Sequence, residues 1–211
     1  MPQVWLTVGA TDDLDVFAGT GYTVMRDLAF DFDPNDAFDG PHRGSNISDT
    51  QAGVQWRFWK SEKHALELAY LSAVTMPTGT DTGRRRLGTS QEFWSWEQAL
   101  LATKDWGLWT TSAEVGYSLP FGDKRGDERG TLTANLAAGY HVFKWLQPEA
   151  ELNYSASFVS RGSGSDRLAA TAGLLFPLND TVCIGAGVQQ ALTGRNEDKS
   201  TTVLFMVRLW W

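Results

Sequence analysis

The stretch TTVLFMVRLWW, Thr201 to Trp211, ends the chain and decides how the rest of it is read. With the two-residue period of a β-strand, one of its faces holds only apolar side chains. These are Val203, Phe205, Val207, Leu209 and Trp211. The other face is mixed, because Thr202 and Arg208 share it with apolar residues. The stretch therefore predicts a strand that places one whole face against apolar surroundings, either the core of a sandwich or lipid.

The same alternation recurs along the chain between short polar segments, and it predicts about eleven strands. Their ranges are 3–10, 14–23, 48–60, 66–76, 90–103, 108–119, 131–142, 148–158, 168–178, 181–192 and 201–211. Short connections favour antiparallel pairing of consecutive strands. The sequence thus predicts an all-β, antiparallel fold in which residues 1–211 form a single domain.

The connections between these strands alternate in length. Tight turns lie near residues 12, 62, 105, 144 and 179, and longer polar loops lie near 35, 82, 125, 163 and 196. Outer-membrane barrels have this rhythm of short periplasmic turns and longer extracellular loops. Tryptophans gather at the short-turn side, as an interfacial aromatic girdle requires; they are Trp106, Trp109, Trp145, Trp210 and Trp211. We therefore expect a transmembrane β-barrel in the outer membrane of a Gram-negative bacterium.

Composition agrees with this interpretation. The 211 residues contain no run of about 18 apolar residues, so no transmembrane helix is expected. The formal net charge of −7 argues against a nucleic-acid partner, which needs a basic face. The single Cys183 excludes an internal disulfide. A soluble lipocalin-like or sandwich fold is the alternative, but its second face should be richly charged, whereas here that face is largely Gly, Ala, Ser and Thr.

An odd number of strands conflicts with the even number of bacterial barrels. Two explanations stay open at this point. Either a first strand and a signal peptide preceded Met1, or Leu28 to Phe32 belongs to an additional strand. In both cases the full barrel is expected to have about 12 strands.

Several short motifs resemble the family of outer-membrane proteins associated with the meta-pathway of phenol degradation. They are Ile47-Ser48-Asp49 before AGVQWRFW, Thr75-Met76-Pro77-Thr78-Gly79 after the next strand, Leu87-Gly88-Thr89-Ser90, and the hairpin VGATDDLDVFAGTGY. The resemblance spans most of the chain. It implies a barrel of about 12 strands with a narrow, partly apolar channel for small hydrophobic molecules.

Strand parity assigns a set of charged side chains to the barrel interior. The polar lumen-lining candidates are Arg57, Glu67, Glu97, Glu114, His141, Glu149, Glu151 and Arg208, and Asp15, Arg167 and Gln189 have the same parity. Residues at equal distances from Glu62 face each other in a symmetric hairpin, so Arg57 should form an ion pair with Glu67. The same arithmetic places His141 near Glu149 and Glu97 near Glu114.

Apolar residues of the same parity indicate what the interior is for. They are Trp5, Phe17, Trp59, Phe93, Leu101, Leu108, Leu175 and Met206. A route for hydrophobic compounds needs apolar steps along its wall. The alternative is that these side chains simply fill the barrel.

No catalytic or metal site is expected. Glu97 with Glu114 could act as a general acid and base, but no third catalytic group is assigned to the same level, so two wall carboxylates are the simpler interpretation. His141 with Ser155 or Ser157 could suggest an outer-membrane lipid enzyme, but parity turns His141 inward, away from lipid. Residues 31–36, DFDPND, place oxygen donors as a calcium loop does but lack its glycine and distal glutamate.

These inferences converge on a porin-like outer-membrane channel, not an enzyme, for passive uptake of small hydrophobic or aromatic molecules. The expected protein is monomeric, needs no cofactor, and has outer-membrane lipid, lipopolysaccharide and the solute as its partners. A structural or adhesive barrel with a plugged lumen is the alternative, followed by a lipid enzyme.

Overall fold

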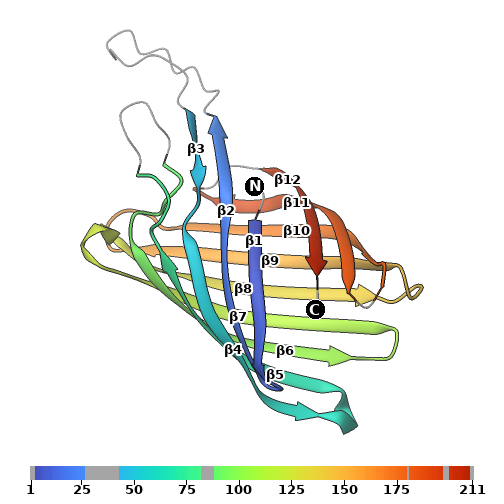
Figure 1. The fold of residues 1–211 in the computed structure, drawn as a ribbon. Helices are drawn as coiled ribbons and strands as arrows, with labels where there is room; N and C mark the ends of the chain where they lie inside the picture. Colours follow the sequence, from blue (N-terminus) through green and yellow to red (C-terminus); the bar gives the residue numbers. More distant parts are fainter. Residues whose placement is uncertain (1–2, 27–42, 82–87, 180, 197–199, 210–211) are drawn as a thin grey trace, which may run out of the picture. The chain divides into compact units, whose positions relative to one another are not determined.

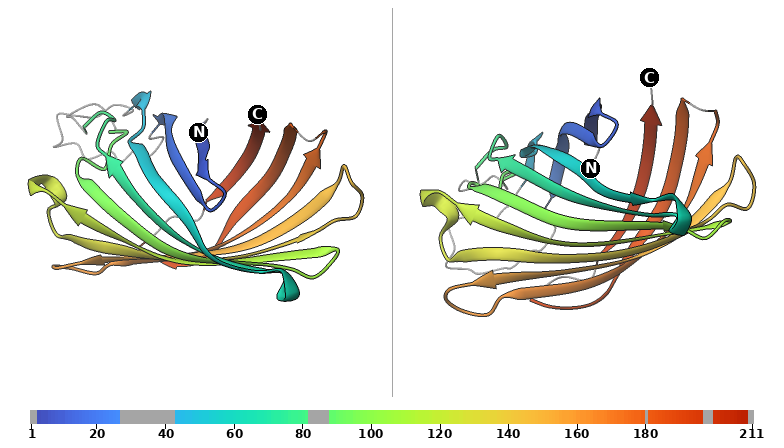
Figure 2. Two further views of the ribbon diagram at one scale, coloured as in Figure 1. Left: turned by 60° about the horizontal axis from the view of Figure 1, so that its bottom comes forward. Right: turned by 90° about the horizontal axis from the view of Figure 1, so that it is seen from below.

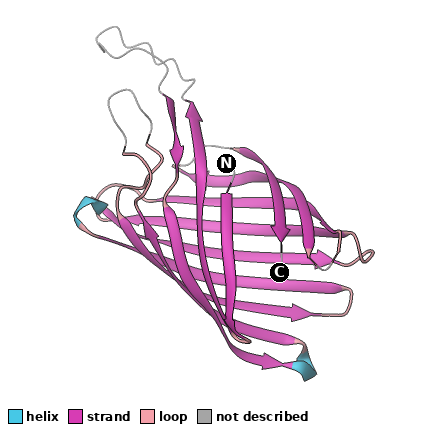
Figure 3. Cartoon of the chain, viewed as in Figure 1, coloured by secondary structure: helices cyan, strands magenta, loops and turns pink. Residues whose placement is uncertain are grey.

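The computed structural model describes residues 3–26, 43–81, 88–179, 181–196 and 200–209. This part of the chain consists of strands and two short 3-10 helices (Figures 1 and 3). The strands are β1 (Gln3–Thr11), β2 (Leu14–Arg26), β3 (Arg43–Ile47), β4 (Thr50–Ser61), β5 (Leu66–Met76), β6 (Trp94–Asp105), β7 (Trp109–Phe121), β8 (Glu128–Tyr140), β9 (Gln147–Val159), β10 (Ser165–Pro177), β11 (Val182–Arg195) and β12 (Thr201–Leu209), and the helices are η1 (Glu62–His64) and η2 (Asp123–Arg125). The prediction of an all-β, antiparallel fold is confirmed.

The strands form a sheet of 12 strands in which neighbours follow the order of the chain, β1-β2-β4-β5-β6-β7-β8-β9-β10-β11-β12, with β3 added beside β2. Such an order, with antiparallel neighbours joined by hairpins, is the up-and-down topology of membrane barrels. Neither of the two described helices has the length and apolar character needed to cross a membrane.

The short strand β3 corrects one prediction. Arg43–Ile47 lies in a stretch that the sequence predicted to be loop. It is a strand because β2 extends to Arg26 and pairs with two partners in succession. The first half of β2 pairs with β4, and the second half, from Tyr22, pairs with β3. The alternative strand at 28–32 lies outside the described residues.

Residue contacts group the chain into two compact units, each of which draws on several strands. Unit 1 comprises Met1–Trp56, Leu71–Glu97 and Leu119–Gly126, and unit 2 comprises Arg57–Tyr70, Gln98–Ser118 and Asp127–Trp211. In unit 2, β8 to β12 lie side by side, from yellow to red in Figure 2. This unit contains most of the side chains considered below.

Side-chain exposure is inverted relative to a soluble domain. The buried apolar residues of the described part are alanines, apart from Cys183. Large apolar side chains are exposed instead, and on β12 Val203, Phe205 and Val207 are 62%, 82% and 67% exposed. A soluble protein rarely exposes so much apolar surface, whereas a barrel places it against lipid. The apolar face of the last strand is therefore a lipid-facing surface.

The connections follow the predicted rhythm only in part. The long connections follow β2 and β5, whose C-terminal ends lie at the same edge of the antiparallel sheet. The tight turn at 12–13 lies at the opposite ends of the strands. Later in the chain the difference disappears, because the connection 141–146 is as long as 122–127. At the short-turn side of unit 2, Trp106, Trp109 and Trp145 are 60%, 51% and 56% exposed, as a girdle requires. Trp210 and Trp211 lie outside the described residues.

Candidate functional site

The candidate site is the polar face of unit 2, on the side of the sheet opposite the exposed apolar face. Register fixes its members, because residues directly opposite each other on neighbouring strands share a face. Glu114 on β7 is opposite Asn135 on β8, which is opposite Asn153 on β9. On the next strands, Thr171 of β10 is opposite Gln189 of β11. One polar residue per strand therefore lies on the same face of each of five neighbouring strands.

These side chains form a continuous hydrogen-bonded chain, which we call the polar row: Glu114, Asn135, Asn153, Thr171, Gln189 and Arg167. Asn135 Nδ2 donates to Glu114 Oε1 at 3.3 Å, and Asn153 Nδ2 donates to Asn135 Oδ1 at 3.2 Å. Asn153 Oδ1 accepts from Thr171 Oγ1 at 3.1 Å and from Gln189 Nε2 at 3.2 Å. Arg167 Nη2 ends the row by donating to Gln189 Oε1 at 3.5 Å. The row begins at a carboxylate and ends at a guanidinium.

An apolar group lies on the same face toward the other end of the strands. Leu175 of β10 and Met206 of β12 are both register partners of Gly185 on β11. A Cβ added at Gly185 would lie 2.8 Å from Cδ2 of Leu175 and 3.2 Å from Cε of Met206. Glycine thus leaves room for both side chains to lie over the sheet. Leu175 and Met206 were both predicted as apolar members of the lumen wall, and they lie together.

The predicted ion pair between Arg57 and Glu67 is present. Arg57 Nη1 lies 3.6 Å from Glu67 Oε1, and the two side chains are 29% and 40% exposed. Lys60 Nζ also approaches Glu67 Oε1, at 3.4 Å. The carboxylate therefore has two basic neighbours from β4, although the sequence predicted only one.

The two carboxylates considered as an acid and base pair are each bound by an amide. Glu97 in unit 1 accepts a hydrogen bond from Gln51 Nε2 at 2.7 Å, and Glu114 in unit 2 accepts from Asn135. Hydrogen bonds from neutral amides fit wall residues and give no sign of a catalytic constellation. Among the described residues, no group of His, Cys, Asp or Glu could hold a metal ion. Residues 31–36 lie outside that part of the chain.

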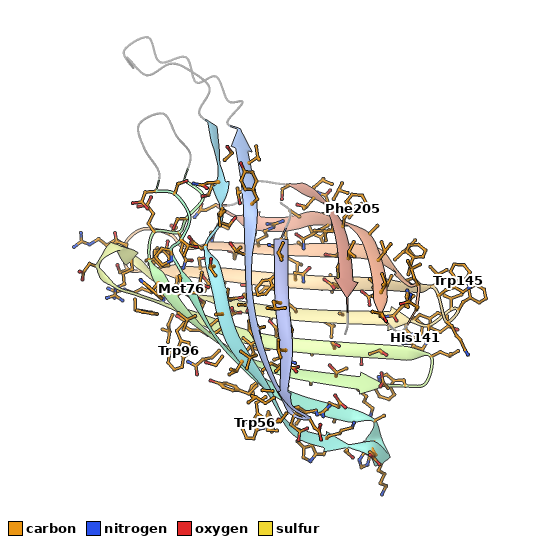
Figure 4. All side chains as sticks on the ribbon, viewed as in Figure 1. Trp56, Met76, Trp96, His141, Trp145 and Phe205 are labelled. Carbon is orange, nitrogen blue, oxygen red and sulfur yellow. The ribbon has the colours of Figure 1, made fainter. Side chains whose placement is uncertain are left out.

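Two predicted wall residues lie in turns. Leu108 precedes β7 and is 57% exposed, and His141 follows β8 and is also exposed (Figure 4). The backbone N–H of His141 donates to the carbonyl of Leu108, and its Nε2 lies 3.4 Å from Thr110 Oγ1. The predicted strand ranges extended one residue too far at Leu108, where Gly107 adopts a φ of +85° in the preceding turn, and two residues too far at the end of β8.

The remaining predicted residues are distributed over both units. In unit 2, Glu149 accepts from Gln147 Nε2 at 2.7 Å, and Glu151 is the register partner of Thr171. Trp59 is 42% exposed and Leu101 is half-buried. In unit 1, Phe17 lies against Trp5 with ring centroids 6.0 Å apart, and half-buried Phe93 precedes β6. Nothing is described of the Arg208 side chain beyond its strand position opposite Cys183.

Unit 1 contains a second cluster, which unites three of the motifs noted in the sequence. Asp49 Oδ1 accepts from the backbone N–H of Gly79 at 3.0 Å, and Asp49 Oδ2 accepts from that of Gln91 at 2.7 Å. Thr89 Oγ1 donates to the carbonyl of Ile47 at 2.9 Å. The segment before β4 therefore binds both ends of the connection between β5 and β6, which is about 30 to 42 positions away in sequence. We call Asp49, Gly79, Thr89 and Gln91 the Asp49 cluster.

Sequence reasoning missed half of the polar row. Asn135, Asn153 and Thr171 carry no charge, so a search for ionisable side chains passed over them. The available signal was positional, since each is a hydrogen-bonding residue of inward parity near the middle of its strand. Only the registers place them opposite one another.

Comparisons with known proteins agree with the fold. The structure is similar to an outer membrane channel from Pseudomonas putida F1, with a TM-score of 0.75 and 14% identity over 99% of this chain and 82% of that chain. It is also similar to a loop L8 deletion mutant of OmpT, an outer membrane protein of Vibrio cholerae, with a TM-score of 0.55 and 12% identity over 99% of this chain and 62% of that chain. None of the curated proteins matches the sequence.

The fold is thus that of outer-membrane β-barrels, and together with the exposed apolar face it places the protein in a bacterial outer membrane. A family model described as "Putative MetA-pathway of phenol degradation" matches residues 6–209, nearly the whole chain. The protein therefore belongs to the family with this description.

Proposed function

We propose that the protein is an outer-membrane channel through which small hydrophobic or aromatic molecules pass without chemical change. The observation that carries the proposal is the character of the inward face of unit 2. Between Glu114 and Arg167 the side chains of the polar row are neutral, and an apolar step of Leu175 and Met206 lies over Gly185. The family description and the channel from Pseudomonas putida support the same function.

The mechanism is differential partitioning. In a barrel, the inward faces of all strands surround one interior, so the face of unit 2 forms part of its wall. A hydrophobic solute that reaches Leu175 and Met206 exchanges water for apolar contact, which is worth about 25 cal/mol per Å² of apolar surface removed from water. Gly173 and Gly187 are register partners between the polar row and this apolar step, and they leave space for the solute to move on. No catalytic step is required.

A specific observation favours a second candidate, a structural barrel with a sealed interior. The polar row joins five neighbouring strands by side-chain hydrogen bonds, and such a network would stiffen a wall whether or not solute passes it. Flux distinguishes the two candidates, because a sealed barrel passes nothing.

The test is uptake by liposomes that contain the purified protein. Benzyl alcohol and toluene should equilibrate faster than in protein-free liposomes, and the recovered solute should be chemically unchanged. Equal rates with and without protein would overturn the channel and leave the structural barrel. Conversion of the solute would instead indicate an enzyme. Light scattering of the protein in detergent tests the expected monomer in the same preparation.

A further inference from the structure

Arg167 differs from the other basic residues of unit 2 in its surroundings. It lies on β10, opposite Ser155 of β9 and Gly194 of β11. Its side chain is half-buried, and Nη2 donates to Ser200 Oγ at 3.1 Å as well as to Gln189. Its Nε is buried and has no hydrogen-bond partner. The guanidinium is therefore held in place by neutral groups while one donor stays unused.

No carboxylate neutralises this charge in the described part of the chain. The ion pairs described there join Arg57 and Lys60 to Glu67, and Arg195 to Asp166. The inward residues nearest in register are hydroxyls, since Ser155 is opposite both Arg167 and Thr133. The acids of the same face lie farther along the strands: Glu151 is opposite Thr171, and Glu114 stands at the far end of the polar row.

Such an arrangement suits the recognition of an anion. A partly buried charge without a counter-charge is unfavourable, and an unsatisfied buried donor adds to the cost. Arginine offers a planar set of donors that matches a carboxylate, and a carboxylate bonded to it would remove both penalties. Because the acids on this face repel anions, attraction would be concentrated at Arg167.

We propose that Arg167 is a carboxylate-recognition residue of the inner wall, and that the solutes include small carboxylates with an apolar body. This rests on the proposed channel function and specifies one class of its solutes. The carboxylate binds the guanidinium with Ser155 and Thr133 beside it. Leu175 lies eight positions along the same strand, roughly 26 Å away at about 3.3 Å per residue. A small solute therefore contacts the apolar step and Arg167 at different points of the wall.

The experiment compares two probes of similar size, benzoate and benzyl alcohol, in liposomes containing wild type, Arg167→Gln, Arg167→Lys or Arg195→Gln. Arg195 lies on the neighbouring strand, is 70% exposed and is already paired with Asp166. Its replacement makes the same change in net charge near the same strand end, outside the proposed site. Benzoate concentration is kept low enough that its flux is proportional to its affinity. Heat-modifiable mobility in gels shows that each variant is folded.

We expect Arg167→Gln to lower benzoate flux about tenfold, which corresponds to about 1.4 kcal/mol, and to change benzyl alcohol flux much less. Arg167→Lys should recover part of the loss because it keeps the charge without the planar donors. Arg195→Gln should behave as wild type. Equal benzoate flux in wild type and Arg167→Gln would overturn the inference, as would an equal loss in Arg195→Gln. A wild type that passes neither probe would instead overturn the channel itself.

Discussion

Asp49 Oδ2 accepts a hydrogen bond from the backbone N–H of Gln91 at 2.7 Å, across 42 positions of sequence. The other carboxylate oxygen binds the N–H of Gly79, so one side chain fixes both ends of the connection between β5 and β6. These are hydrogen bonds from backbone donors to an ionised acceptor, which are stronger than neutral ones.

Asp49→Ala should loosen this connection. Two backbone donors lose their acceptor, and each such loss costs about 1–3 kcal/mol where water cannot fully replace it. Amide hydrogen exchange at Gly79 and Gln91 should become at least tenfold faster, while exchange in β9 and β10 stays the same. Glu62→Ala in the exposed turn η1 is the control. Unchanged protection of both amides would show that the cluster is held together without Asp49.

The lipid-facing side of β12 gives a second prediction. Phe205 is 82% exposed, and arginine on the lipid face of a barrel costs about 2–4 kcal/mol at the middle of the bilayer. Phe205→Arg should therefore reduce folding into vesicles, and Phe205→Leu, which keeps an apolar side chain, should not. The folded fraction is measured by heat-modifiable mobility in gels. Equal folding of the two variants would mean that Phe205 does not contact lipid.

Gly185 and Ala186 give a matched pair on opposite faces of β11. A valine at 185 would displace the ends of Leu175 and Met206 and narrow the proposed passage, whereas the side chain at 186 is exposed on the other face. Benzyl alcohol uptake should fall several-fold in Gly185→Val and stay as in wild type in Ala186→Val. If both variants transport equally, the apolar step does not lie on the route.

Asn153 is the centre of the polar row, where it donates to one side chain and accepts from two. Asn153→Leu keeps the approximate volume but leaves Asn135, Thr171 and Gln189 with unsatisfied groups. Unfolding in urea should show a loss of about 1–3 kcal/mol. Ser155→Ala, two positions along the same face, should change stability much less. A stable Asn153→Leu variant would indicate that water replaces these hydrogen bonds.

The ion pair of Arg57 and Glu67 should contribute little to stability. Both side chains are partly exposed, and such pairs are typically worth about 0.2–1 kcal/mol. A double-mutant cycle with Arg57→Gln and Glu67→Gln should give a coupling energy within this range, reduced further in 1 M salt, because Lys60 keeps Glu67 paired. A coupling above about 2 kcal/mol would contradict the exposed setting of the pair.

Local pattern in the sequence determined every described strand except β3, together with their antiparallel order and the lipid-facing side. The reason is geometric. Side chains alternate along a strand, so an apolar face such as that of Val203, Phe205 and Val207 can be identified from the sequence of that strand alone. Hairpin symmetry extended this to nearest neighbours and correctly predicted the ion pair of Arg57 with Glu67. The same arithmetic could not determine where Leu108 and His141 leave the strands, because turn conformation depends on single residues such as Gly107.

Only the tertiary structure decided which residues meet across several strands. The polar row joins residues from β7 to β11, and a shift of one residue in any of these registers would turn a member to the opposite face. The neutral surroundings of Arg167 among the described residues, and the hydrogen bonds of Asp49 to both ends of a distant connection, depend on the same registers and connections. Periodicity gives each strand its faces, but the pairing of one strand with the next sets the contacts, and those contacts make the site.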